Sequence, residues 1–89
     1  MKLSYKPEFM SDYDRLPRHI QKRLNQKLKL LLDNLHHPSL RVRKIQGVVK
    51  GYQNVFEGSI NMNYRFLFQI EGDIYVMLRC GTHTQIFGR

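Results

Sequence analysis

The sequence predicts an α+β fold of element order β-α-α-β-β-β, with a helical hairpin packed on one face of a mostly antiparallel, twisted sheet. Three observations predict it. Apolar residues recur with helical spacing between Leu16 and Leu35. Beyond Pro38 the apolar period changes to two, which is typical of strands. Two alternating runs, residues 63–70 and 74–80, then flank a short glycine-containing turn, as in a β-hairpin.

The chain of 89 residues is expected to form one domain, residues 1–89, which is long enough for a single hydrophobic core. The N-terminus lacks the apolar segment of a secretory signal, and no run approaches the length of a membrane span. We therefore expect a cytoplasmic protein without a membrane partner. The single cysteine excludes an internal disulfide and gives no metal framework, so neither a metal nor a cofactor is expected.

The first half of the chain predicts a short strand and two helices. Lys2 to Tyr5 is the opening strand, and Pro7 suits the first turn of a helix because its missing N–H costs nothing there. Pro17 ends or kinks that helix. The second helix is amphipathic and closed by Pro38, with an apolar stripe at spacings of three and four: Leu16, Ile20, Leu24, Leu28, Leu31 and Leu35.

The segment after Pro38 is expected to contribute strand-like structure. Leu40 and Val42 alternate with Arg41 and Arg43, and a glycine-containing loop then covers residues 47–51. Residues 52–60 are predicted to form a strand that turns into the hairpin. Pairing Ile60 with Tyr64 sets Phe56 against Phe68 and places Glu57 and Ser59 beside Leu67 and Arg65 on the other face.

The register of the final hairpin follows from its apolar residues, because a slip of one residue would move one strand's side chains to the opposite face. The matching register pairs Phe68 with Leu78 and Phe66 with Cys80. It also places Arg65 and Arg79 on one face, diagonally across the ladder, roughly 7–8 Å apart at Cβ. Since the two helices cover only one side of the sheet, we expect this arginine face to be open.

Arg65 and Arg79 repel each other at this separation, and an anion bound between them would attract both side chains. Gly81 and His83 continue the same alternation, and a glycine allows a backbone to approach closely. Two arginines, a histidine and a glycine suit a phosphate better than a core. Alternatively, His83 is merely an exposed terminal histidine, and Arg65 forms a salt bridge with Glu57.

The formal net charge of +8 and the pI of about 10.0 also indicate a polyanionic partner. Nucleic acid is favoured, an acidic protein partner remains open, and a merely soluble basic protein is the simplest alternative. His36-His37-Pro38 is interpreted as a helix end because adjacent histidines do not share a helical face. Cys80 is assigned to the core.

Three motifs resemble the RelE/ParE toxin superfamily over nearly the whole chain. They are the strand Tyr64-Arg65-Phe66-Leu67-Phe68-Gln69, the ending Leu78-Arg79-Cys80-Gly81-Thr82-His83-Thr84-Gln85-Ile86-Phe87, and the loop Lys44-Ile45-Gln46-Gly47, which is similar to the family's Lys-Leu-x-Gly segment. The Gly-Thr-His ending is similar to the YafQ-type branch. The resemblance implies a RelE-like fold and a toxin of a type II toxin–antitoxin pair.

Toxins of this superfamily typically cut messenger RNA in the ribosomal A site, on the 30S subunit, and are held inactive by a cognate antitoxin. The resemblance therefore implies a ribosome-dependent mRNA endoribonuclease, present as a monomer or as a toxin–antitoxin hetero-oligomer. The matching motif positions are Arg65, Arg79, His83 and Phe87. The chain departs from the YafQ-type pattern at Ser59 and Asn63, where a histidine and an aspartate are usual.

RNA is cut without a metal when its 2′-hydroxyl attacks the adjacent phosphate, which requires a base, an acid and cations. Arg65 and Arg79 are candidates for phosphate binding because guanidinium groups pair bidentately with phosphate oxygens. His83 is the best proton-transfer group, since imidazole titrates near neutrality, and it is left open as acid or base. Glu57 either holds Arg65 or serves as a second proton acceptor.

Six further residues are candidates for RNA binding. Four cations are expected to contact the RNA backbone and the aromatic residues to stack on bases: Arg41, Arg43, Lys44, Lys50, Tyr52 and Phe87. Packing on the sheet is an equal alternative for Tyr52. Two other functions remain open: a ParE-type toxin that inhibits DNA gyrase without nuclease activity, and an inactive module that only binds RNA or a partner.

Overall fold

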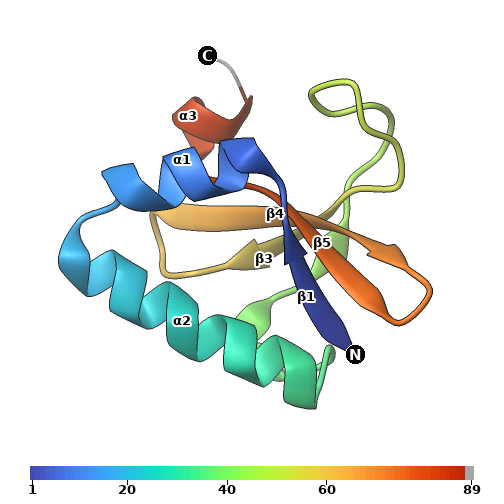
Figure 1. Cartoon of the computed structure of the whole chain (residues 1–89), viewed down its shortest axis with the longest axis horizontal. Helices are drawn as coiled ribbons and strands as arrows, with labels where there is room; N and C mark the ends of the chain where they lie inside the picture. The colour runs from blue at the N-terminus through green and yellow to red at the C-terminus, as the bar shows by residue number, and fades with distance from the viewer. Residues whose placement is uncertain (88–89) are drawn as a thin grey trace.

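The computed structural model describes residues 1–87 as a mixed five-stranded sheet of order β1-β5-β4-β3-β2, with helices packed against it (Figure 1). Residues 88–89 of the expected domain lie outside the described range. The strands are β1 (Lys2–Tyr5), β2 (Arg43–Lys44), β3 (Phe56–Ser59), β4 (Tyr64–Glu71) and β5 (Ile74–Thr82). β1 runs parallel to β5, and the other neighbours are antiparallel. The predicted fold class is confirmed.

The helices are α1 (Pro7–Arg15), α2 (Arg18–Asp33), a 3₁₀ turn η1 (Pro38–Leu40) and α3 (His83–Phe87). The predicted helical hairpin at Pro17 is confirmed. α2 ends at Asp33, short of Leu35, because Asn34 has extended backbone angles and its side chain accepts the N–H of His36 at 3.0 Å. Within residues 1–87, no helix is both long and apolar enough to cross a bilayer.

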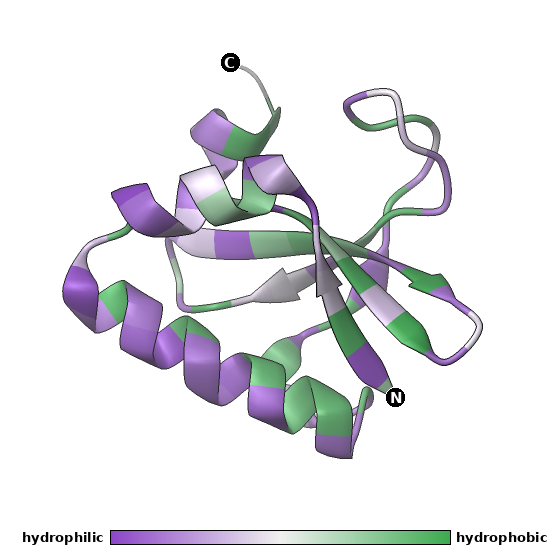
Figure 2. Ribbon diagram, in the orientation of Figure 1, coloured by the Kyte–Doolittle hydropathy of each residue, from purple (hydrophilic) through white to green (hydrophobic). Residues whose placement is uncertain are grey.

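The main core lies between the α1–α2 hairpin and the sheet. The predicted stripe is buried there from Leu16 to Leu31, whereas Leu35 is only partly buried. Phe9, Phe66 and Phe68 join this core, and each is at most 1% exposed. Hydrophobic and hydrophilic bands alternate along α2 in Figure 2, as expected of an amphipathic helix. Cys80 belongs to this core as predicted, and burial raises the pKa of its thiol to about 12. The thiol is therefore a packing group.

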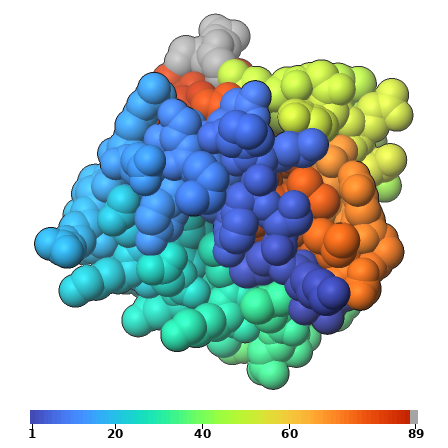
Figure 3. Space-filling view, viewed as in Figure 1, coloured from blue at the N-terminus to red at the C-terminus, as the bar shows by residue number. Residues whose placement is uncertain are grey.

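A second, smaller core covers part of the opposite face of the sheet. It contains Val49, Val55, Leu67, Val76, Leu78 and Ile86. These residues come from the loop of residues 45–55, from β4 and β5, and from α3. In the space-filling view the yellow-green loop adjoins the red C-terminal helix (Figure 3). The expectation of an entirely open face is therefore wrong, although part of that face remains accessible.

The strands on either side of this loop are shorter than expected. Leu40 lies in η1 and is fully buried, so β2 contains only Arg43–Lys44. Tyr52 makes only an isolated bridge with Val49, and the third strand begins at Phe56. The backbone takes positive φ at Gly47, Lys50, Gly51 and Asn54, which interrupts the extended conformation between the two strands.

The hairpin register is confirmed at one end and wrong at the other. Phe66 pairs with Cys80 and Phe56 with Phe68 as predicted, but Phe68 lies opposite Met77 rather than Leu78. An extra residue in β5 forms an irregularity opposite Leu67/Phe68, of the β-bulge kind. Met77 therefore faces the main core and Leu78 the second core. Apolar side chains on both faces of β5 become buried in this way.

Candidate functional site

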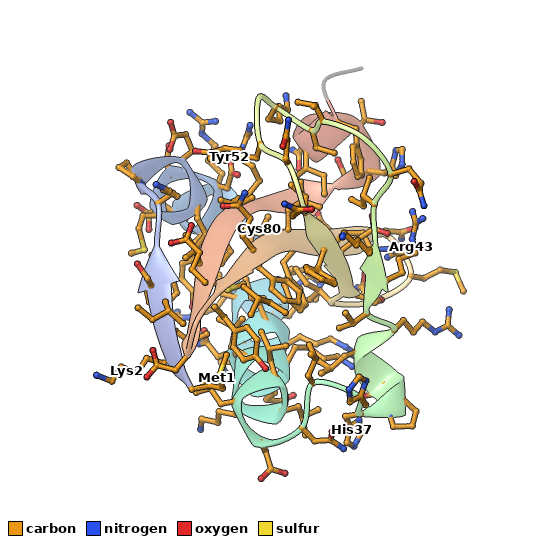
Figure 4. The ribbon with its side chains drawn as sticks, turned by 90° about the vertical axis from the view of Figure 1, so that its right-hand side faces the viewer. Met1, Lys2, His37, Arg43, Tyr52 and Cys80 are labelled. Atoms are coloured by element: carbon orange, nitrogen blue, oxygen red, sulfur yellow. The ribbon has the colours of Figure 1, made fainter. Side chains whose placement is uncertain are left out.

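A cavity of about 300 Å³ lies beside the second core, on the face of the sheet away from α2. It is lined by Arg41, Arg43, Glu57, Ser59, Arg65 and His83. Arg41 directly follows η1, and the other residues come from β2, β3, β4 and the first position of α3. Figure 4 shows β2, with Arg43, at the border of the sheet. Five predicted site residues are thus brought together around one opening.

Glu57 lies at the base of this cavity and is only 5% exposed. Its position opposite Arg43 in the β2–β3 ladder explains its partner: Arg43 Nε donates to Oε1 at 2.8 Å. The alternative of a salt bridge between Glu57 and Arg65 is wrong. The buried Oε2 atom has no hydrogen-bond partner among residues 1–87. Buried carboxylate oxygens in proteins are normally hydrogen-bonded, so this atom is a position where a water molecule or a bound ligand is expected to donate.

Arg65 is held at the rim by the turn that joins β3 to β4. Its Nη1 atom donates to the backbone carbonyls of Asn61 and Tyr64. Asn61 orders the turn by accepting the N–H groups of Asn63 at 2.8 Å and Tyr64 at 2.9 Å. The Ser59 hydroxyl donates to the Asn61 carbonyl at 2.9 Å. Ser59 therefore helps to shape the turn that positions Arg65.

His83 is positioned by α3, a helix that the sequence analysis did not predict. Thr82 and Gln85 form a capping box: Gln85 N–H donates to Thr82 Oγ1 at 3.2 Å, and Thr82 N–H donates to Gln85 Oε1 at 2.8 Å. Buried Ile86 anchors the helix to the second core. His83 is exposed and stacks on Phe87, with ring centroids 4.4 Å apart. The Thr-x-x-Gln spacing was the signal for this helix.

Arg79 pairs with Leu67 as predicted, which places it on the strand face of Arg65, but its guanidinium lies outside the cavity, so the two arginines do not line one open site. Its Nε and Nη2 atoms donate to the carboxylate of Asp12 at 2.6 and 3.1 Å. Asp12 also accepts the Cys80 N–H at 3.1 Å and is 8% exposed. The hydrogen bonds that Arg79 donates to Asp12 raise the pKa of its guanidinium.

The β5 irregularity and the end of β1 at Tyr5 explain this arrangement. Beyond Met77, α1 rather than a strand packs along β5, and it supplies Asp12. The signal for Asp12 was its position: it lies three residues after Phe9 and four before Leu16, on the apolar side of α1. An acidic residue there needs a buried cationic partner.

The remaining predicted RNA-binding residues are spread around the cavity. Arg41 and Arg43 line it, whereas Lys44 lines a neighbouring cavity. Lys50 is exposed in the loop of residues 45–55. Tyr52 and Phe87 pack partly against the second core. For Tyr52, this contact corresponds to the packing on the sheet that was the alternative to stacking on an RNA base.

The cavity is lined mainly by basic side chains. Three guanidinium groups and an imidazole surround one carboxylate, which leaves an excess of positive charge. Within the described range, no group of three or more His, Cys, Asp or Glu side chains is arranged to hold a metal ion. The cavity therefore brings three guanidinium groups together with one carboxylate and one imidazole.

Comparisons with known proteins agree with this fold. The family model described as "ParE toxin of type II toxin-antitoxin system, parDE" matches residues 3–87. YafQ from E. coli strain BL21(DE3) superposes with a TM-score of 0.80 at 17% identity, covering 97% of each chain. The RelB–RelE antitoxin–toxin complex from Methanococcus jannaschii gives 0.74 at 24% identity, covering 96% of this chain and 95% of the other.

The YoeB/ParE toxin from Agrobacterium tumefaciens has a TM-score of 0.77 at 16% identity, covering 93% of this chain and 99% of its own. No curated protein sequence matches significantly. The structural similarities concern the fold, whereas the family model spans nearly the whole sequence. This chain therefore belongs to the ParE toxin family of type II toxin–antitoxin systems, within the RelE/ParE superfamily that its motifs resemble.

Proposed function

We propose that this toxin is a ribosome-dependent endoribonuclease that inhibits translation by cutting messenger RNA through the RNA's own 2′-hydroxyl. One observation supports this most strongly: the buried Oε2 atom of Glu57 lines the same cavity as Arg65 and His83. A carboxylate oxygen without a partner among residues 1–87, next to cations, is suited to accepting a proton from an RNA hydroxyl.

In the proposed reaction, the 2′-oxygen forms a bond to the adjacent phosphorus, and the bond from phosphorus to the 5′-oxygen breaks. Glu57 Oε2 takes the 2′-hydroxyl proton, and His83 gives a proton to the departing 5′-oxygen. The products are a 2′,3′-cyclic phosphate and a 5′-hydroxyl end. Both proton-transfer groups line one cavity, and His83 is exposed to the approaching strand.

The cations stabilise the charge that builds on the phosphoryl oxygens. Arg65 is oriented by two backbone carbonyls, and Arg43 is oriented by Glu57, so both are arranged before the substrate binds. Arg41 adds a third guanidinium at the rim. Arg79 has no part in this scheme as a phosphate ligand. Its role is to fix α1 to β5 through Asp12.

We also propose an acidic cognate antitoxin as the regulatory partner, in a toxin–antitoxin hetero-oligomer. Two considerations support it. Several structural neighbours are complexes of a toxin with its antitoxin, such as RelB–RelE and DinJ–YafQ. The net charge of +8 favours a partner segment rich in acidic residues.

The test is to induce the toxin in growing cells and map the 5′ ends of messenger RNA. The wild type should arrest growth and produce breaks within translated codons. His83→Ala should relieve the arrest and remove the breaks. His19→Ala, at an exposed position on α2, is the matched control and should leave both unchanged. Undiminished cleavage by His83→Ala would contradict the proposed site.

Inhibition of DNA gyrase is the second candidate function, favoured by the ParE description of the matching family model. A gyrase inhibitor would induce DNA damage signalling while translation continues, and the purified toxin would block supercoiling. Ribosome binding without cleavage would instead identify an inactive RNA-binding module. These outcomes are distinct, so messenger RNA cleavage, DNA damage signalling and ribosome binding, all measured after induction, separate the three functions.

A further inference from the structure

A second cavity, larger than the first, lies at the other side of β2. It encloses about 360 Å³, and its lining includes Leu35, His36, His37, Arg41, Lys44 and Phe56. Arg41 and Arg43 line both cavities, so the two openings meet at the border of the sheet. In Figure 4, Arg43 and His37 lie along this same border. A continuous cationic path therefore leads from the first cavity around the edge strand to the second.

We infer that this second cavity binds the nucleotide next to the scissile phosphate of a single-stranded RNA. This inference rests on the proposed function, because it extends the substrate path of the same reaction. The nucleotide would pass over Arg41 and Arg43 and place its base against Phe56, with its phosphate beside Lys44 and His36.

The lining has the composition that such a nucleotide requires. Phe56 is half-buried and stacks on Phe68 with a centroid distance of 5.6 Å, so its ring is held rigidly at the cavity wall. A fixed aromatic wall next to basic side chains suits base stacking combined with phosphate binding. Lys44 and His36 are exposed and available to a phosphate.

His37 contributes an oriented hydrogen-bond donor. Its Nδ1 atom accepts the backbone N–H of Ser39 at 3.2 Å, which caps η1. With Nδ1 acting as an acceptor, the ring proton lies on Nε2. Nε2 can therefore donate to a phosphate oxygen or to a base.

Backbone strain at Arg41 points to the same use. Arg41 has φ of 49°, a left-handed conformation that disfavours side chains other than those of glycine and asparagine. Its side chain is exposed, so packing does not account for an arginine at this position. A guanidinium needed at the junction of two binding cavities does account for it.

The experiment measures the affinity of 2′-O-methyl oligoribonucleotides, which the toxin cannot cut, by calorimetry. A dinucleotide contains a single phosphodiester and fills only the first cavity, whereas a tetranucleotide reaches the second. We expect the wild type to bind the tetranucleotide about tenfold more tightly. The double variant His36→Ala/Lys44→Gln should remove this advantage.

Two further variants sharpen the result. Phe56→Leu should reduce the affinity for the tetranucleotide several-fold, and circular dichroism checks that this variant folds. If it does not fold, the exposed substitutions His36→Ala and Lys44→Gln provide the test. Lys22→Gln, an exposed lysine on α2, is the matched control for lost charge. Lys44→Gln should lower the slope of log affinity against log salt by about 0.7, while Lys22→Gln should not.

The outcomes separate the two proposals. Equal affinity for both lengths in the wild type, or an undiminished tetranucleotide advantage in the double variant, would overturn the second cavity. Dinucleotide binding that survives in Arg65→Gln would instead overturn the first cavity and with it the proposed reaction. Failure of the wild type to bind either length would overturn RNA binding at the second cavity, whereas the proposed reaction is judged by cleavage on ribosomes.

Discussion

Two arginines on neighbouring strands, Arg65 on β4 and Arg79 on β5, have different environments in this toxin. Arg79 meets a buried carboxylate, and its Nε–Asp12 distance is 2.6 Å. Arg65 donates to backbone carbonyls, and no carboxylate pairs with it in the described part of the chain. A guanidinium neutralised inside the protein stabilises the fold, whereas one oriented by carbonyls keeps its charge for a ligand.

The largest expected effect is on cleavage. Arg65→Gln should lower the cleavage rate by about 10²–10³-fold, the usual result of removing one preorganised electrostatic contact. Its free energy of unfolding should fall by only about 1 kcal/mol, because the substitution removes only hydrogen bonds to backbone carbonyls. The rate is measured by primer extension in a purified translation reaction. A variant that cleaves at the wild-type rate would assign Arg65 a structural role like that of Arg79.

Asp12→Ala should have the opposite profile. It leaves Arg79 and the Cys80 N–H without their acceptor and should lower the free energy of unfolding by about 2–4 kcal/mol, allowing for the partial exposure of Arg79. Urea unfolding measures this loss. Asp14→Ala, at an exposed position on the same helix, is the control and should change stability by less than about 0.5 kcal/mol. Equal effects of the two substitutions would remove the distinction between the arginines.

The capping box of α3 should have a smaller effect that is still visible in activity. Gln85→Ala should weaken α3 by about 1 kcal/mol and reduce cleavage because His83 is no longer held in place. Gln85→Glu keeps the capping acceptor and should restore both. Hydrogen exchange of the α3 amides reports the local loss. Full activity of Gln85→Ala would show that His83 needs no such positioning.

Arg41→Gly should have the smallest effect on the free energy of unfolding, and unlike most substitutions it should not lower it. Glycine adopts the left-handed backbone of Arg41 without strain, so the free energy of unfolding should stay the same or rise by up to about 1 kcal/mol. RNA affinity should nevertheless fall. Lys22→Gly within α2 should instead lower stability by about 1 kcal/mol. A clear loss of stability in Arg41→Gly would show that the side chain serves the fold.

The sequence was sufficient for elements defined by local periodicity. The stripe of α2 and the pairing of Phe66 with Cys80 follow from apolar spacing, and both are present. The second core could not be predicted in this way, because Val49 and Val55 lie in a loop without a repeating period. The irregularity in β5 depends on apolar side chains being buried on both faces, which the strand pattern alone leaves ambiguous.

The sequence identified residues that line the candidate cavity, but it did not identify the ion pairs that arginine side chains form in and around it. Arg41, Arg43, Glu57, Arg65 and His83 were selected from the sequence and line one cavity. The pairing of Arg79 with Asp12 joins residues 67 positions apart, and no local pattern encodes it. The pairing of Glu57 with Arg43 depends on the β2–β3 register. Because β2 has only two residues, its sequence pattern is too short to predict that register.

The most direct test of the account is the cleavage of messenger RNA on purified ribosomes by Glu57→Gln. This substitution preserves the shape of the side chain and an acceptor for Arg43 but removes the proton-accepting carboxylate. The account predicts 2′,3′-cyclic phosphate ends with the wild type, and a rate at least about 10²-fold lower with Glu57→Gln, while ribosome binding persists. Cleavage by Glu57→Gln at the wild-type rate would contradict it.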